Sequence, residues 1–250
     1  MSPREWDAAT YDRVAQPQEE WAREVVGRLE LSGDETVLDA GCGSGRATKL
    51  LLERLPRGRV IGVDASSVMI AKAREALGDK VELIVADLLD LELPEPVDAI
   101  FSNATFHWIL DHRRLFERLH AALRPGGVLE AQCGGIGNVE EFLNTVESVN
   151  GDERFAPYLR GIADLWNFAS PGDTELRLRG AGFEVRRCWL TEASTQPREP
   201  RGFLESVCLG AQLDRLPAEL RAPYVAAVLE VIPQPLTLHY VRLNISARRP

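Results

Sequence analysis

The stretch Thr36-Val-Leu-Asp-Ala-Gly-Cys-Gly-Ser-Gly-Arg-Ala-Thr48 decides the fold. Its apolar start predicts a buried strand, its alternate glycines predict a tight turn, and the periodic pattern over residues 46–55 predicts a helix. Glycine lets the backbone turn sharply and lets a ligand approach it closely, while the free N–H groups of the helix start face the same space. The stretch therefore predicts a ligand site where the first strand ends.

Size and charge narrow the class of protein. The chain has 250 residues and a formal net charge of -9. This length suits one α/β domain, or an α/β core with a small cap. A sequence-independent grip on nucleic acid needs clustered Lys and Arg, which the acidic balance disfavours. We therefore expect a small-molecule substrate, no nucleic acid partner, and a monomer or weak homodimer.

The cysteines and the N-terminal stretch bear on location. The four cysteines lie far apart and form no C-x-x-C pair, so neither a metal site nor a disulfide framework is predicted: Cys42, Cys133, Cys188 and Cys208. The first residues are charged and lack an apolar leader core, and no later segment approaches the roughly 20 apolar residues of a membrane span. We expect a cytoplasmic protein without a membrane partner.

Short apolar segments alternate with helical periods along the first half of the chain. Further strands are predicted at residues 59–64, 80–87, 96–103 and from 128 onward, with helices at 17–29, 67–76 and 115–123. The later runs 181–189 and 236–247 add two more strands. The pattern predicts an α/β fold with a seven-stranded, doubly wound, Rossmann-like sheet that is mostly parallel, with an antiparallel last strand and a helical cap.

Two long segments interrupt the strand pattern and divide the chain. We expect a single structural domain with a cap, divided into residues 1–31 (lid segment and helix), 32–133 (cofactor-binding core), 134–180 (first cap insertion) and 181–250 (last two strands, with a second insertion at 190–235). These insertions, with helices at 201–213 and 218–231, are too apolar for disorder. In the lid segment, Trp6 and Tyr11 either pack on the domain or cover the ligand.

The residues of the turn discriminate between cofactors. A nicotinamide fingerprint, G-x-G-x-x-G, would need glycine where Arg46 stands. Asp39 precedes the turn, where a carboxylate would repel a pyrophosphate and favour a ligand that carries an ammonium group. The turn therefore favours a cationic ligand over a dinucleotide.

At this point a family resemblance emerges. The run Val37-Leu-Asp-Ala-Gly-Cys-Gly-Ser-Gly45, Asp64 at the end of the second strand and Ala86-Asp87 at the end of the third resemble the signature of class I S-adenosyl-methionine-dependent methyltransferases. The resemblance implies that the glycines cradle the methionine and ribose, that Asp64 accepts hydrogen bonds from the ribose hydroxyls, and that Asp87 meets the adenine amino group. Met69 either packs on adenine or belongs to the core. The implied cofactor residues are Asp39, Gly41, Gly43, Gly45, Asp64, Met69, Asp87 and Asn103.

The segment after the fourth strand makes the resemblance narrower. Phe101-Ser-Asn-Ala-Thr-Phe-His-Trp-Ile-Leu-Asp-His112 is similar to the S-N-A-x-x-H-W-x-x-D-H pattern of the trans-aconitate methyltransferase group. The likeness extends over roughly residues 4–132 and weakens where Gly134-Gly-Ile-Gly137 replaces a Pro-containing segment. Asn103 is followed by Ala-Thr, not by the Pro-Pro-Tyr/Phe of many nucleobase and amide methyltransferases. The resemblance implies O-methylation of a small carboxylic acid.

The chemistry of the acceptor decides which residues the reaction needs. A carboxylate has a pKa near 4 and needs no base, so positioning suffices. A hydroxyl or an acidic carbon would need one, and His107 is the candidate. His107 and Trp108 otherwise line the substrate or pack in the fold. An anionic substrate would need arginine partners, for which the candidates are Arg46, Arg198, Arg201 and Arg242.

Two other functions stay open on the sequence. One is a natural-product O- or C-methyltransferase that uses His107 as general base. The other is a non-catalytic protein that binds S-adenosyl-methionine, which would be marked by a damaged glycine turn or a missing ribose carboxylate. Neither mark is present, because Gly41, Gly43, Gly45 and Asp64 are all in place.

Overall fold

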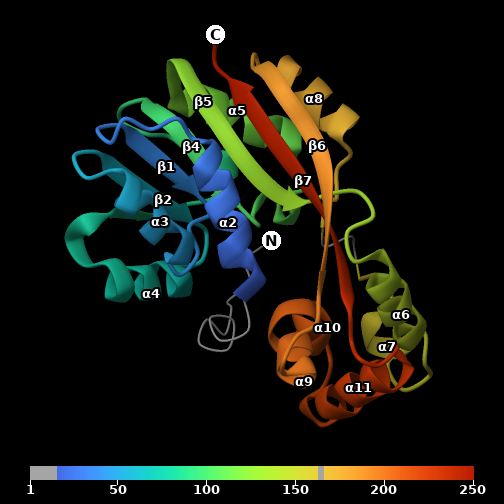
Figure 1. Ribbon diagram of the computed structural model, residues 1–250. Coiled ribbons are helices and arrows are strands. Elements are labelled where there is room, and N and C mark those ends of the chain that lie inside the picture. The colour runs from blue at the N-terminus through green and yellow to red at the C-terminus, as the bar shows by residue number, and fades with distance from the viewer. Residues whose placement is uncertain (1–15, 163–165) are drawn as a thin grey trace.

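The computed structural model describes residues 16–162 and 166–250. Its centre is a seven-stranded sheet in the order β3-β2-β1-β4-β5-β7-β6 (Figure 1). Strands β1 to β5 run parallel, and β7 is antiparallel to both of its neighbours. The strands are β1 Thr36–Ala40, β2 Arg59–Asp64, β3 Glu82–Val85, β4 Val97–Asn103, β5 Leu123–Gly134, β6 Glu184–Thr195 and β7 Leu238–Arg248. The predicted fold class is confirmed; Trp6 and Tyr11 lie outside the described residues.

Helices cover both faces of the sheet and divide the core in two. On one face α2, α3 and α4 bury Val25, Leu51 and Ile70 against β1 and β2. On the other face α5 and α8 bury Phe116 and Leu178 against β4, β5 and β7. The helices are α2 Gln16–Arg28, α3 Arg46–Arg54, α4 Ser67–Leu77, α5 His112–Ala122 and α8 Pro171–Gly180. This two-sided packing fixes the carboxyl ends of the parallel strands along one edge, where ligands of doubly wound folds bind.

A third apolar cluster lies beyond the sheet, where β6 and β7 continue past its other strands (Figure 1). It is formed by α6 Glu140–Asn150, α7 Ala156–Leu159, α9 Pro200–Phe203, a π-helical turn Leu204–Cys208, α10 Gly210–Arg215 and α11 Ala218–Val231. Tyr224 is fully buried at its centre, edge-on to Phe155 at 5.1 Å between ring centroids. Its hydroxyl donates to Asn150 Oδ1 at 2.6 Å. We refer to these helices as the cap.

The structure corrects three predicted boundaries. Strand β6 continues beyond Trp189 to Thr195, because it stays paired with β7 as far as Leu238. Its side chains are mostly exposed along this outer strand, so hydrophobic alternation gave no signal there. The predicted helix 201–213 is instead α9, the π-helical turn and α10. The fifth strand was predicted from residue 128 but begins at Leu123. The Arg124-Pro-Gly-Gly127 segment lies inside β5, where the pairing with β4 is irregular.

Within the described ranges, no helix is both long and apolar enough to cross a membrane.

Replacing Tyr224 by Phe is expected to lower the free energy of unfolding by about 1–3 kcal/mol, because it leaves the buried Asn150 Oδ1 without its hydroxyl donor. Urea denaturation followed by circular dichroism measures the change. The matched control is Tyr158→Phe, which removes the same atom from a ring that is 44% exposed and should change stability by less than about 0.5 kcal/mol. Equal losses in the two variants would contradict the role of this hydrogen bond.

Candidate cofactor and acceptor site

The three glycines of the turn after β1 all have positive φ but serve different purposes. A Cβ on Gly41 would lie 2.2 Å from the Thr105 side chain, and one on Gly45 would lie 2.6 Å from Leu77. These two glycines make room for the protein's own side chains. Among the residues that the structure describes, a Cβ on Gly43 would meet nothing within 4 Å. Gly43 is therefore the glycine of the turn that borders open space, as a ligand cradle requires.

Asp64 ends β2 beside the turn. Its Oδ2 accepts the Gly43 N–H at 3.0 Å and its Oδ1 accepts the Ser66 N–H at 2.8 Å. The N-cap of α4 is Ser66, whose hydroxyl accepts the Met69 N–H, so Asp64 is not the helix cap. Burial raises the pKa of Asp64, and the two N–H donors partly offset this. Each carboxylate oxygen keeps a second lone pair with which it can accept a ligand hydroxyl.

Asp39 lies deeper, and its side chain is only 1% exposed. The Thr48 hydroxyl, on α3, donates to its Oδ2 at 2.7 Å. Burial raises the pKa of Asp39 to about 7, against the Thr48 hydrogen bond, and the nearby negative charge of Asp64 raises it further. Two carboxylates around one turn lower the electrostatic potential there, which suits a cationic ligand and opposes a pyrophosphate.

The remaining predicted cofactor residues lie at three neighbouring points. Met69 is buried but belongs to neither of the two sheet clusters. Asp87 is exposed and caps a short 3-10 turn by accepting the Leu89 N–H. It follows Ala86, whose N–H donates to the Asp64 carbonyl oxygen at 3.1 Å. Asn103 ends β4. The ends of β1, β2, β3 and β4 thus bring these predicted residues to one edge.

The chain turns sharply after Asn103. Ala104 has φ 59°, a left-handed conformation that is uncommon for a residue with a side chain, and its N–H donates to the Gln132 carbonyl oxygen at 2.7 Å. The turn places Thr105 over Gly41 and starts the 3-10 helix Phe106–Trp108. His107 therefore follows, by two residues, the side chain that contacts the glycine turn.

His107 has a defined protonation state. It is 8% exposed, and the Gly134 N–H donates to its Nδ1 at 3.2 Å. A backbone N–H can only donate, so Nδ1 carries a lone pair and the single ring proton is on Nε2. Burial holds the pKa of His107 well below its ordinary value of 6.5, and the charges of Arg242 and His112 lower it further. The imidazole is neutral, with Nε2–H as a donor.

Aromatic rings pack around His107, and sequence reasoning missed two of them, Trp166 and Phe168. Phe168 stacks on it with centroids 5.8 Å apart, and Trp166 stacks on Phe168 at the same separation. Trp108 lies 5.6 Å from Trp166. A Cβ on Gly134 would lie 2.6 Å from Phe168, so the unusual glycine after the fifth strand was the available signal.

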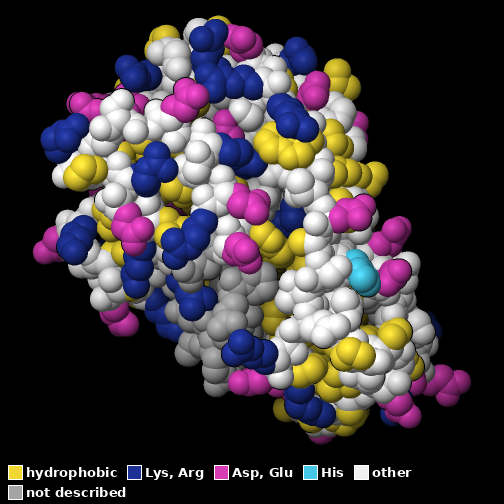
Figure 2. Space-filling model, viewed as in Figure 1, with side chains coloured by type: hydrophobic (Ala, Val, Ile, Leu, Met, Phe, Trp, Pro, Cys, Tyr) yellow, Lys and Arg dark blue, Asp and Glu magenta, His cyan; other side chains and the backbone are white. Residues whose placement is uncertain are grey.

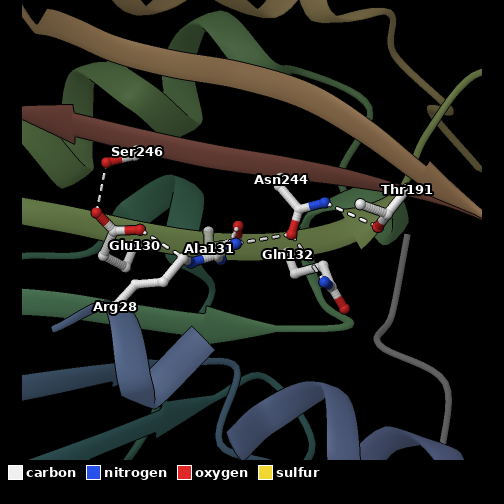
Figure 3. Close-up of polar contacts among 7 residues, drawn as sticks. All are labelled: Arg28, Glu130, Ala131, Gln132, Thr191, Asn244 and Ser246. Atoms are coloured by element: carbon white, nitrogen blue, oxygen red, sulfur yellow. Dashed lines mark hydrogen bonds and ion pairs between the residues drawn. The ribbon is translucent and has the colours of Figure 1, made fainter. Parts of the chain in front are cut away.

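A buried polar network crosses the sheet beside this region (Figure 3). The Arg28 guanidinium on α2 pairs with Glu130 at 3.1 Å, donates to Asn244 Oδ1 at 2.7 Å and donates to the Ala131 carbonyl oxygen at 3.0 Å. Gln132 Nε2 also donates to Asn244 Oδ1, at 2.8 Å. The network fixes the orientation of the Gln132 amide, whose oxygen then faces away from Asn244.

The four candidate arginines have different surroundings. Arg198 lies in the link between β6 and the cap and Arg201 lies on α9; both are exposed, and Arg201 pairs with Glu205. Arg46 begins α3, in the cofactor half of the site. Arg242, on β7, is 3% exposed. On the face drawn in Figure 2, basic and acidic side chains are interspersed rather than gathered into one basic patch.

Comparison with known proteins places this chain in a family. The family pattern described as a methyltransferase domain matches residues 37–127. A trans-aconitate 2-methyltransferase from Methylobacterium nodulans is 34% identical over 98% of both chains. One from Azoarcus sp. (strain BH72) is 45% identical over 127 residues, 51% of this chain and 50% of the relative. The chain thus spans nearly the full length of the first relative and about half of the second.

Solved structures agree with the fold. An S-adenosylmethionine-dependent methyltransferase from Mesorhizobium loti is 22% identical, covers 92% of this chain and 98% of its own, and superposes with a TM-score of 0.56. The chain therefore belongs to the class I S-adenosyl-methionine-dependent methyltransferases. Within that class, the relatives named above are trans-aconitate methyltransferases.

The residues present fit this cofactor. The open space at Gly43 accommodates a ligand against backbone, and the carboxylates of Asp39 and Asp64 match a ligand with ammonium and sulfonium charges and ribose hydroxyls.

Binding of S-adenosyl-methionine should weaken as the pH falls below about 7, because protonation of Asp39, whose pKa is about 7, removes a negative charge that favours the cation. A bound cation lowers the pKa of Asp39 in the complex, so affinity rises with pH through about 7 and then levels off. Calorimetric titrations between about pH 5.5 and 8.5 measure this slope, which is at most about tenfold per pH unit.

The variant Asp39→Asn tests the charge of Asp39 alone. It removes the titratable carboxylate, while its amide oxygen still accepts the hydrogen bond from the Thr48 hydroxyl. It should bind more weakly above pH 7 and lose the slope near that pH. A slope that persists unchanged in this variant would assign the pH dependence to another group.

Replacing Gly43 by Ala is expected to weaken binding of S-adenosyl-homocysteine at least about tenfold, because its methyl group would enter the space that borders the turn. Calorimetry gives the affinity, and thermal unfolding gives the backbone cost. Gly126→Ala is the control, since Gly126 also has positive φ and open space around a built Cβ, but it lies in β5 away from the turn. Equal affinities for the two variants would refute Gly43 as the cradle.

Proposed function

We propose that this chain transfers the methyl group of S-adenosyl-methionine to a carboxylate oxygen of a small, trans-aconitate-like acid. The observation that carries the proposal is the hydrogen bond from the Gly134 N–H to His107 Nδ1. It leaves His107 as a neutral donor through Nε2, which suits an acceptor that arrives already ionised. The names of the two relatives, both trans-aconitate 2-methyltransferases, support the same substrate class.

The reaction needs little from the protein beyond alignment. When bound, S-adenosyl-methionine supplies an electrophilic methyl carbon, which a carboxylate oxygen attacks in line with the departing sulfur. The acceptor loses no proton, because its pKa near 4 leaves it ionised at neutral pH. The chain must hold the carboxylate at a reacting distance of about 3–3.5 Å and exclude water.

His107 is suited to positioning this carboxylate. Its Nε2–H can donate to one carboxylate oxygen while the other attacks, and the Gly134 N–H and the Phe168 ring hold the imidazole plane. The same hydrogen bond disfavours His107 as a general base, because Nδ1 is engaged and Nε2 already carries the proton. Burial and the charge of Arg242 also oppose formation of the imidazolium that a base would become.

The cap completes the proposal. Its helices α6 and α9 to α11 pack around one cluster that lies past the ends of the parallel strands, as a cover for the acceptor requires (Figure 1). We assign this role to α6 and α7 of the predicted first insertion and to α9, α10 and α11 of the second, whereas α8, which the first insertion also includes, packs on the sheet. The four free thiols support the cytoplasmic location that the sequence predicts.

Substitutions at His107 test the proposal against the base alternative. Turnover of trans-aconitate, followed by release of S-adenosyl-homocysteine, is expected to fall on the order of 10- to 100-fold in His107→Ala, the usual scale for one lost catalytic hydrogen bond. His107→Gln should recover most of the loss, because its amide places an N–H donor near the position of Nε2. The rate should show no ionisation of the acceptor between about pH 6 and 8.

His239 provides the control, because it is exposed on β7 and its replacement by Ala should leave turnover unchanged. A wild-type enzyme that ignores carboxylic acids and methylates a phenol would overturn the proposal. So would a His107→Gln variant as inactive as His107→Ala, since an amide replaces a donor but not a base.

A further inference from the structure

Arg242 lies directly beside the residue that holds His107. In the antiparallel pairing of β5 and β7, Arg242 is opposite Gly134, the donor to His107 Nδ1. Opposite residues in such a pair have Cα atoms about 4.5–5.5 Å apart and share one face of the sheet. The positive charge of Arg242 acts to lower the pKa of both His107 and Cys133. The guanidinium thus belongs to the acceptor side of the site.

The protein fixes the Arg242 side chain from two directions. Its guanidinium lies over the Trp21 ring of α2, 4.5 Å from the centroid, and its Nε donates to Gln132 Oε1 at 3.4 Å. The Gln132 oxygen faces Arg242 because its amide nitrogen donates to Asn244, which Arg28 holds in turn. A guanidinium held in this way is pre-organised, so less conformational entropy is lost when it binds a ligand.

Charge is divided across the site. The carboxylates of Asp39 and Asp64 lie in the cofactor half, whereas the guanidinium of Arg242 lies across the ladder from Gly134, in the acceptor half. Glu130, which lies further along the same face, is paired with Arg28 and Ser246. An arginine fork binds a carboxylate through two parallel N–H donors. This arrangement matches a cationic cofactor beside an anionic acceptor.

We propose that Arg242 determines substrate specificity by binding a second carboxylate of the acceptor, while His107 positions the carboxylate that is methylated. The preferred acceptor is then a di- or tricarboxylate rather than a monocarboxylate. The inference rests on the proposed function for its reaction, but it concerns binding and can be measured without turnover. Arg198 and Arg201, the other candidates on this half of the chain, are exposed, and Arg201 is paired with Glu205.

The experiment compares three unsaturated acids with one, two and three carboxylates: crotonate, fumarate and trans-aconitate. For each, kcat and KM are measured with wild type, Arg242→Gln, Arg242→Lys and the exposed-charge control Arg198→Gln. Binding of trans-aconitate in the presence of S-adenosyl-homocysteine is measured by calorimetry. Thermal unfolding and the affinity for S-adenosyl-homocysteine show whether each variant remains folded with an intact cofactor half.

In Arg242→Gln, KM for trans-aconitate should rise on the order of 100-fold, the scale for a lost partner of a buried charge pair, with a smaller change in kcat. The kcat and KM of the same variant for crotonate should stay within about twofold of the wild-type values. The KM of Arg242→Lys for trans-aconitate should lie between those of wild type and Arg242→Gln, because lysine keeps the positive charge but lacks the two parallel N–H donors. Arg198→Gln should match wild type. If Arg242→Gln does not fold, the Arg242→Lys comparison across the three acids decides.

The outcomes separate the two proposals. Equal losses for all three acids would assign Arg242 a structural role and overturn the inference, while methylation by wild type would leave the proposed function intact. Wild type that binds trans-aconitate through Arg242 without methylating it would overturn the proposed function and support the inference. Wild type that neither binds nor methylates any of the acids would overturn both.

Discussion

One carbonyl oxygen organises the site. The N–H groups of Gly41 and Cys42 both donate to the Val63 oxygen, at 2.8 and 3.0 Å, and so tie the end of β1 to the end of β2. That tie sets Asp64 beside Gly43. Thr105 then donates to the Gly41 oxygen and draws in the loop after β4. Three strand ends meet around one turn, and this meeting places Asp64 and Thr105 against it.

The acceptor half depends on a different support. Here the backbone N–H of Gly134 settles which nitrogen of His107 carries the proton, and the missing side chain of the same glycine admits the Phe168 ring. Arg242 is held across the ladder from this residue. A single glycine at the end of β5 therefore governs protonation, ring packing and the placement of charge. Such economy leaves little freedom for substitution at that position.

Much of the fold was predictable because its signals are local. The β2 range was predicted without error, since a buried parallel strand is a short apolar run between turn residues. The long outer strand β6 was predicted too short, because strand pairing rather than burial extends it. In the site, the glycine turn is itself a recognisable sequence motif, and Asp64 follows it at the end of the next strand. Phe168 stacks on His107 and Trp166 stacks on Phe168, so this contact joins segments about 60 residues apart, and single-sequence patterns carry no information on such contacts.

Strands β6 and β7, which continue past the rest of the sheet, connect the core to the cap. β6 and β7 stay hydrogen-bonded to each other from the core, at Glu184 and Arg248, to the cap, at Thr195 and Leu238. The cap helices α9, α10 and α11 are thus joined to the core through a two-stranded ribbon. Arg242 lies midway along this ribbon, opposite Thr191. A change of side-chain packing in the cap can therefore shift Arg242 through the paired strands. On the specificity role proposed for Arg242, substrate range can be changed by residues far from the acceptor, through the register of a ribbon that the core and the cap share.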